Sequence, residues 1–176
     1  MGYITVAEAK TWLGITDQSE DEQILALIEA ASAAVSAVGN RDFDKQTVTE
    51  YYYGMASSYL FLRRTPVISV DSVEINGTAV EFTSDSLTVK RTNGTFQTSD
   101  YVKVTYTGGF EPIPADVKLA TKMTVQAMRN AAAMDPNLTG ESLGGVFSGG
   151  YSEFGPGAVP RAARNLLNNY IKNFTL

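Results

Sequence analysis

Apolar and polar positions at the start of the chain recur with the period of a helix. In "TVAEAKTWLG", Thr5 and Glu8 have the spacing of a capping box, and Gly14 stands where a helix would end. The pattern therefore predicts a short first helix. Trp12 and Leu13 belong to its apolar positions, and we expect them to be buried anchors.

A longer helix is predicted after the polar stretch "TDQSEDEQ". Ser19 and Glu22 repeat the capping-box spacing, and acidic residues crowd the first turn, where the helix dipole favours them. Gly39-Asn40 ends the run. This is the strongest helix prediction in the chain, and its many alanines favour close contact between helices. Its apolar positions recur every three or four residues: Ile24, Leu27, Ile28, Ala31, Val35 and Val38.

From about residue 46 the pattern changes from helical to alternating. "TVTEYYYG" and "SYLFLRR" are rich in β-branched and aromatic residues, which favour strands. The clearest hairpin signal is Asn76-Gly77 between two alternating runs, and a second turn is expected at Asn93-Gly94. We predict about six short antiparallel strands in residues 46–108. The last of these strands lies in "DYVKVTYTGG", and its alternation puts three residues on one face: Val102, Val104 and Tyr106.

The helical period returns at Pro114, because proline is favoured at the first position of a helix. Apolar residues then cover two sides of the predicted helix, which is typical of a central helix with several neighbours. One face carries Val117, Ala120, Thr121, Thr124, Ala127, Met128 and Ala131, and the second adds Leu119, Met123 and Met134.

A Gly/Ser-rich connection, residues 135–159, precedes a last helix that opens at Pro160. A loop of this length is usually functional or disordered. Either it folds back on its own domain, or it orders against a neighbouring subunit or partner. It carries apolar and aromatic residues that a solvated linker would not need: Leu143, Val146, Phe147, Tyr151 and Phe154. The last helix has an apolar face with Leu166, Leu167, Tyr170, Ile171 and Phe174.

The composition narrows the possible functions. The chain has 176 residues, a length that favours one domain, and an ordinary globular composition. It contains neither cysteine nor histidine, which excludes disulfides, thiolate or imidazole metal sites and Ser-His-Asp triads. The net charge of −5 disfavours tight wrapping of nucleic acid. We see no signal peptide and no apolar stretch of about 18 residues, so we expect no membrane span.

Gly108-Gly109, between a strand-like and a helix-like run, raises the question of a phosphate site. Neither the P-loop pattern nor the dinucleotide pattern is present, so we interpret the pair as the joint at which the chain leaves a sheet. The run Tyr51-Tyr52-Tyr53 has few basic neighbours for base stacking, and alternate tyrosines of a strand cover two surfaces. "DQSED" lacks the glycine and glutamate of a calcium loop. We predict no catalytic residue, no metal and no cofactor.

Six segments, in order, carry a resemblance to a known family: "TVAEAKTWLGI", "EDEQILALIEAASAAV", "LRRTPVISVDSVEINGT", "VTYTGGFEPIPADVKLATKMTVQAM", "GES" and "VPRAARNLLNNYIK". The most specific pieces are TPV-x-SV-x-SV before the Asn-Gly turn, and V-x-Y-x-GG followed by P-x-D-V-K. Over nearly its whole length the chain resembles the head-tail connector (adaptor) proteins of tailed double-stranded-DNA bacteriophages.

The resemblance implies an α+β fold, in which a helical bundle carries an inserted antiparallel β region. We expect a single connector domain over residues 1–176. Residues 1–45 and 110–176 would form the bundle of about four helices, and residues 46–108 the insertion.

The resemblance also implies a structural virion protein without enzymatic activity, located in the neck and assembled in the host cytoplasm. Family members form a ring of about twelve subunits beneath the portal, which extends the DNA channel and docks the stopper or tail-completion protein. The implied partners are other copies of the chain, the portal, the stopper, and DNA that passes without sequence-specific binding. We expect subunit or portal contacts at Leu143, Val146, Phe147, Tyr151, Phe154, Arg161, Arg164, Tyr170 and Phe174.

Two other functions stay open. A tail-completion or tail-terminator protein also forms rings. A carbohydrate-binding β module with helical flanks would show an exposed aromatic cleft, for which the candidates are Tyr51, Tyr53 and Tyr59.

Overall fold

The computed structural model describes residues 2–132, 140–143, 147–150 and 159–171. It has the α+β architecture that the sequence predicts, and the chain forms two compact units. The helical unit consists of residues 1–41 and 113–176, and the β unit consists of residues 42–112. The interpretation of the whole chain as one connector domain stays a prediction.

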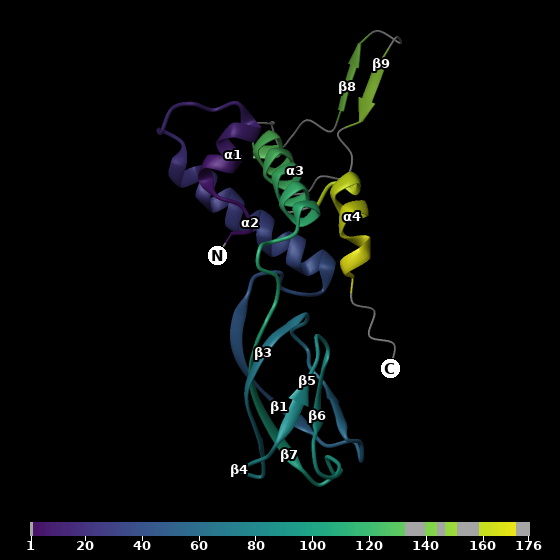
Figure 1. Cartoon of the computed structure of the whole chain (residues 1–176). Coiled ribbons are helices and arrows are strands. Elements are labelled where there is room, and N and C mark those ends of the chain that lie inside the picture. Colours follow the sequence, from purple (N-terminus) through teal and green to yellow (C-terminus); the bar gives the residue numbers. More distant parts are fainter. Residues whose placement is uncertain (1, 133–139, 144–146, 151–158, 172–176) are drawn as a thin grey trace. The chain divides into compact units, whose positions relative to one another are not determined.

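The helical unit is organised around its third helix, α3, which contacts α1, α2 and α4 (Figure 1). This agrees with the two apolar sides that the sequence predicts for it. The described elements of this unit are α1 (Val6–Leu13), α2 (Asp21–Gly39), α3 (Ala115–Ala132), β8 (Gly140–Leu143), β9 (Phe147–Gly150), α4 (Arg161–Leu167) and the 3₁₀ turn η1 (Asn168–Tyr170). One cluster of its buried residues contains Ile4, Ala9, Ile24, Ile28, Ala31 and Val125.

The first helix begins and ends as the sequence predicts. Thr5 Oγ1 accepts a hydrogen bond from the Glu8 N–H (3.1 Å), and the Glu8 carboxylate accepts one from the Thr5 N–H (2.8 Å). Gly14 ends the helix in the left-handed region, with φ 70°. The prediction that Trp12 is a buried anchor is wrong, because its side chain lies at the surface and is 43% exposed.

The capping box predicted at Ser19 and Glu22 is also wrong. α2 begins at Asp21, and within the described residues no side chain caps its first turn. Ser19 instead donates its N–H to Asp17 Oδ1 (2.9 Å), so it belongs to the turn before the helix. The end of α2 is as predicted, since the residue after Gly39 adopts the left-handed conformation.

α2 is a core helix with one buried face. By length and composition alone it is long and apolar enough to cross a membrane, so the expectation that no stretch reaches that length is wrong. Its inner face packs in the same cluster as Val125 of α3, which accounts for its apolar content. The predicted apolar positions that are buried are Ile24, Ile28, Ala31 and Val35.

Two antiparallel sheets enclose the core of the β unit (Figure 1). The strand order is β1-β7-β3-β4 in one sheet and β2-β6-β5 in the other. The strands are β1 (Gln46–Tyr53), β2 (Tyr59–Phe61), β3 (Val67–Ile75), β4 (Thr78–Ala79), β5 (Phe82–Ser84), β6 (Thr88–Arg91) and β7 (Tyr101–Gly108). The core includes Tyr52, Leu60, Leu62, Val73, Ile75, Val89, Phe96 and the predicted set Val102, Val104 and Tyr106.

The hairpin predicted at Asn76-Gly77 is confirmed. Ile75 pairs with Thr78, and both turn residues have positive φ (51° and 85°), as a type I′ turn requires. The segment after this turn contributes one strand to each sheet, because β4 pairs with β3 and β5 pairs with β6. The fully described region 46–108 therefore has seven strands, where the sequence indicated about six.

The end of the chain differs from the prediction in two ways. The last helix was expected from Pro160 to Phe174, but α4 ends at Leu167 and the 3₁₀ turn follows. The Gly-rich connection was expected to be a loop, but within it β8 and β9 pair as antiparallel strands. Their register places Gly140 opposite Gly150.

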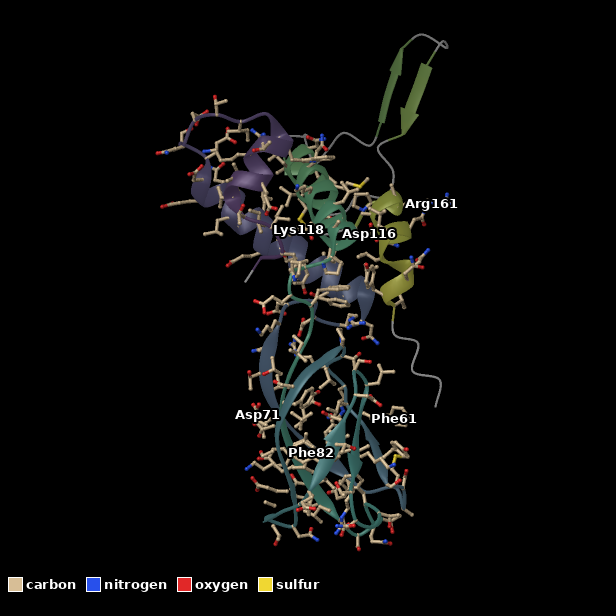
Figure 2. The ribbon with its side chains drawn as sticks, viewed as in Figure 1. Phe61, Asp71, Phe82, Asp116, Lys118 and Arg161 are labelled. Atoms are coloured by element: carbon tan, nitrogen blue, oxygen red, sulfur yellow. The ribbon has the colours of Figure 1, made fainter. Side chains whose placement is uncertain are left out.

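Replacing Phe96 with alanine tests the core of the β unit. Phe96 is fully buried between the sheets, so Phe96→Ala should lower the free energy of unfolding by about 3–5 kcal/mol. Phe61→Ala is the matched control, because this ring is 70% exposed on β2 and its loss should change stability by less than about 0.5 kcal/mol (Figure 2). Urea unfolding followed by circular dichroism measures both, and equal losses would contradict the described core.

Candidate assembly surfaces

The Gly108-Gly109 joint is structural, as interpreted from the sequence. A Cβ on Gly108 would lie 2.3 Å from the Arg64 carbonyl oxygen, and one on Gly109 would lie 2.1 Å from the Asp44 carbonyl oxygen. Gly109 has φ 113°, and its N–H donates to the Pro66 carbonyl (2.9 Å). The glycines thus let the chain pack against itself, and the Gly109 N–H is already used within the protein.

Arg64 holds the end of the β unit where the chain enters and leaves it. Its Nη2 donates to Asp42 Oδ2 and to Gln46 Oε1 (both 2.9 Å), and its Nη1 donates to the Asp44 carbonyl (2.9 Å). The Arg64 side chain is only 12% exposed. A guanidinium with several fixed acceptors restricts the segment before β1, so the backbone at this end of the β unit is held rigidly.

A partly buried polar network lies within the β unit. The Glu50 carboxylate accepts hydrogen bonds from the hydroxyls of Tyr106 (2.7 Å) and Tyr52. These hydroxyls in turn accept from the backbone N–H groups of Arg64 (2.8 Å) and Arg63 (3.2 Å). Burial, with the neighbouring carboxylate, raises the pKa of Tyr52, and burial is also the main cause that raises the pKa of Tyr106 to about 12. The network therefore joins β1 and β7 to the segment that follows β2.

Three tyrosines form a stacked group on the outer face of the larger sheet. The rings of Tyr51 and Tyr101 are 5.3 Å apart and nearly parallel, and Tyr53 lies 5.7 Å from Tyr101. Tyr52, between them in sequence, points into the core, so the tyrosine run covers two surfaces as expected. Tyr59 lies exposed on β2 of the other sheet. The aromatic residues considered for a carbohydrate cleft are therefore divided between two sheets.

The surface of the helical unit has a hollow between α1 and α3. It measures about 410 Å³ and is lined by Ala7, Glu8, Thr11, Trp12 and Lys122; we call it the α1–α3 hollow. The Trp12 indole N–H donates to Gln126 Oε1 (3.1 Å), which fixes the ring at its edge. Leu119, predicted to be part of a second apolar face of α3, is 37% exposed.

One wall of the α1–α3 hollow is held by an ion pair. Lys118 Nζ, labelled in Figure 2, lies 3.0 Å from Glu8 Oε1. The Thr5 backbone N–H and then Lys118 hold the pKa of Glu8 below its usual value. Lys122 has no ion pair within the described ranges. The hollow thus combines apolar surface with one cation whose charge is not neutralised there.

The predicted contact residues of the last helix differ in how they are engaged. Arg161 is exposed and extends away from α4 (Figure 2). Arg164 is also exposed, but its Nε donates to the Val159 carbonyl (2.9 Å). Tyr170 is half-buried, and burial together with the Asp116 carboxylate raises its pKa. Arg161 is therefore the one of these three that the described part of the chain leaves unengaged.

The other predicted contact residues belong to the Gly-rich segment and the end of the chain. Leu143 is the last residue of β8 and Phe147 the first of β9, and the two pair across the hairpin. Four of the predicted contact residues lie outside the described residues: Val146, Tyr151, Phe154 and Phe174.

The titratable groups of the described residues are the candidates for binding a metal ion or for a shifted pKa. The described ranges contain no group of three or more carboxylates that could hold a metal ion. The most strongly perturbed groups are the phenols of Tyr52 and Tyr106, which donate hydrogen bonds to Glu50 inside the β unit.

Comparison with known proteins identifies the family. A family model described as head completion protein (HCP) matches residues 3–172. The chain belongs to the head completion protein family. The match includes both the helical unit and the β unit, so it applies to the protein as a whole. It confirms the resemblance that the six sequence segments carry.

Solved structures share the fold of this head completion protein. One is a chain from the "Neck of empty GTA particle computed with C6 symmetry", with a TM-score of 0.67 and 16% identity over 99% of this chain and 92% of that chain. Another is from the "Virion of native gene transfer agent (GTA) particle", with a TM-score of 0.65, 16% identity and the same coverage. No curated protein sequence matches the chain.

The Glu50 network generates a prediction for Tyr106→Phe. The change removes the hydroxyl that donates to Glu50 and accepts from the Arg64 N–H, and it should cost about 1–3 kcal/mol at neutral pH. Tyr101→Phe is the control, because Tyr101 lies exposed on the same strand.

The raised pKa of Tyr106 adds a pH dependence with a definite sign. A phenol that titrates near 10 when unfolded and at about 12 when folded stabilises the fold fully below pH 10. That contribution is lost as the pH rises from about 10 to 12. The wild type should therefore lose more stability than Tyr106→Phe between pH 8 and 11, as measured by urea midpoints. Equal losses would show that Tyr106 does not titrate in the folded protein as described.

Proposed function

We propose that this head completion protein is a head-tail connector (adaptor), a structural subunit of the virion neck without enzymatic activity. Copies of the chain form a ring beneath the portal, extend the DNA channel and present a surface on which the stopper or tail docks. The observation that carries the proposal is the family match over residues 3–172.

The structural neighbours support a place in the neck. One of them comes from a neck computed with C6 symmetry, in which any ring around the axis would hold a multiple of six copies. This is consistent with the ring of about twelve subunits that the resemblance implies. A head-to-tail contact that repeats around an axis closes such a ring without a second kind of interface.

The charge of the chain suits a channel through which DNA moves. A net charge of −5 leaves few cations for phosphate neutralisation, which is the main source of affinity for nucleic acid. A weak attraction to the phosphates would let DNA slide through the ring, and nothing in this role requires sequence-specific binding. The absence of histidine and cysteine from the sequence agrees with a structural role.

Particles that lack this protein test the proposal. Heads made without it should be filled but should fail to join tails, and added purified protein should restore joining and appear as new density at the portal vertex. Normal joining in its absence, or added protein that leaves the portal vertex unchanged, would contradict the connector function. Density at the far end of the tail would instead support the tail-terminator alternative.

Arg161 on α4 is a candidate portal contact that can be tested separately. Arg161→Glu should lower binding to tailless heads several-fold, because it reverses an exposed charge that the described chain leaves unengaged. Its fold should be retained, since an acidic residue is favoured in the first turn of a helix. Arg161→Lys is the matched control and should bind nearly as well as the wild type. Binding to heads by the glutamate variant at the wild-type level would remove Arg161 from the contact.

A further inference from the structure

The α1–α3 hollow has the features of an unfilled protein-binding site. Trp12, which lines the hollow, is 43% exposed although it is a large apolar side chain on a helix. Half-buried Lys122 stands in the hollow without an ion pair to any residue in the described part of the chain. An exposed tryptophan and a cation without an ion pair, at one place, match an occupant with an apolar side chain and a carboxylate.

The outer face of α2 offers that combination. Leu25 is 48% exposed there, and Glu22 and Glu29 are exposed on either side of it along the helix. Neither glutamate makes an ion pair with a residue that the structure describes. Residues 21–39 include no lysine or arginine, so this face is purely acidic. The other exposed positions of α2 are Gln23 and four alanines, Ala26, Ala30, Ala33 and Ala37.

The two surfaces belong to the same helical unit but complement each other only between copies. In one copy, α2 turns its inner face to α3, with Ile24 and Ile28 in the core, and its outer face to solvent. We propose that the outer face of α2 in one subunit docks into the α1–α3 hollow of the next subunit. This inference rests on the proposed ring function and names the contact that would close the ring.

The chemistry of the proposed contact is specific. Leu25 packs against the exposed ring of Trp12, and the acidic side chains beside it neutralise Lys122. The alanines let the backbone of α2 approach its neighbour closely, as in helix pairs with small residues at the contact. Because the donor face and the acceptor hollow are different surfaces, the contact is head-to-tail and propagates around an axis.

Charge reversal tests this contact. Lys122→Glu and Glu29→Lys should each weaken association between copies about tenfold per contact, because each places like charges opposite one another. The double variant Lys122→Glu/Glu29→Lys restores opposite charges at every contact and should recover most of the association. Glu81→Lys, an exposed acid in the β unit, makes the same change in net charge as Glu29→Lys and should have no effect.

The measurement is the size of the assembly, by analytical ultracentrifugation of purified protein and by imaging of tailless heads to which the protein is added. Circular dichroism shows whether each variant remains folded. A carbodiimide reagent, which joins a lysine to a nearby carboxylate, should also link Lys122 of one wild-type copy to Glu22 or Glu29 of another.

The outcomes separate the two proposals. If association between copies is lost in both single variants and recovered in the double variant, the α2 contact is supported. Two results would overturn the α2 contact and leave the connector function standing. In the first, both single variants form rings as well as the wild type does. In the second, the single variants are folded but do not associate, and the double variant does not recover association. A wild-type chain that forms no ring, in solution or on heads, would overturn both.

Discussion

The pairing of β1 with β7 is the interaction on which the architecture depends. These strands pair along their whole length, from Gln46 opposite Gly108 to Tyr53 opposite Tyr101. Because they are the first and last strands of the β unit and run antiparallel, the segments that enter and leave the unit lie together. Phe43 and Phe110 stack there with their ring centroids 6.2 Å apart, and Arg64 binds the entering segment. A long insertion can therefore stand between α2 and α3 in sequence while both helices contribute to one core.

The distribution of satisfied and unsatisfied groups distinguishes the interior from the assembly surfaces. Inside the β unit, Glu50 has two phenolic donors, and those phenols have backbone donors of their own. Such a closed network of hydrogen bonds rigidifies the fold of the β unit. On the helical unit the opposite holds at the α1–α3 hollow, where the Trp12 ring is exposed and the Lys122 ammonium group has no ion pair to a described residue. The proposed ring would require this combination of rigid subunits and complementary outer surfaces.

Local signals in the sequence predicted much of this fold, and tertiary contacts account for most of what they missed. The capping box at Thr5 and the Asn76-Gly77 turn each depend on a few adjacent residues, and both are confirmed. The second capping box failed because Ser19 bonds to Asp17, a competitor at even shorter range. Trp12 was misplaced because its burial depends on where α1 meets α3, more than one hundred residues later in sequence. The sequence does carry a signal for Glu50, because strand alternation puts it on the same face as buried Tyr52. The α1–α3 hollow had no such signal, because it exists only where two distant helices come together.

The most direct test of the account is a cryo-electron microscopy reconstruction of the neck at a resolution that shows side chains. The account predicts a closed ring of this chain around the DNA channel, with neighbouring subunits joined through their helical units and each β unit intact as an enclosed pair of sheets. A single copy at the portal vertex, or copies around the channel that do not touch one another, would contradict it.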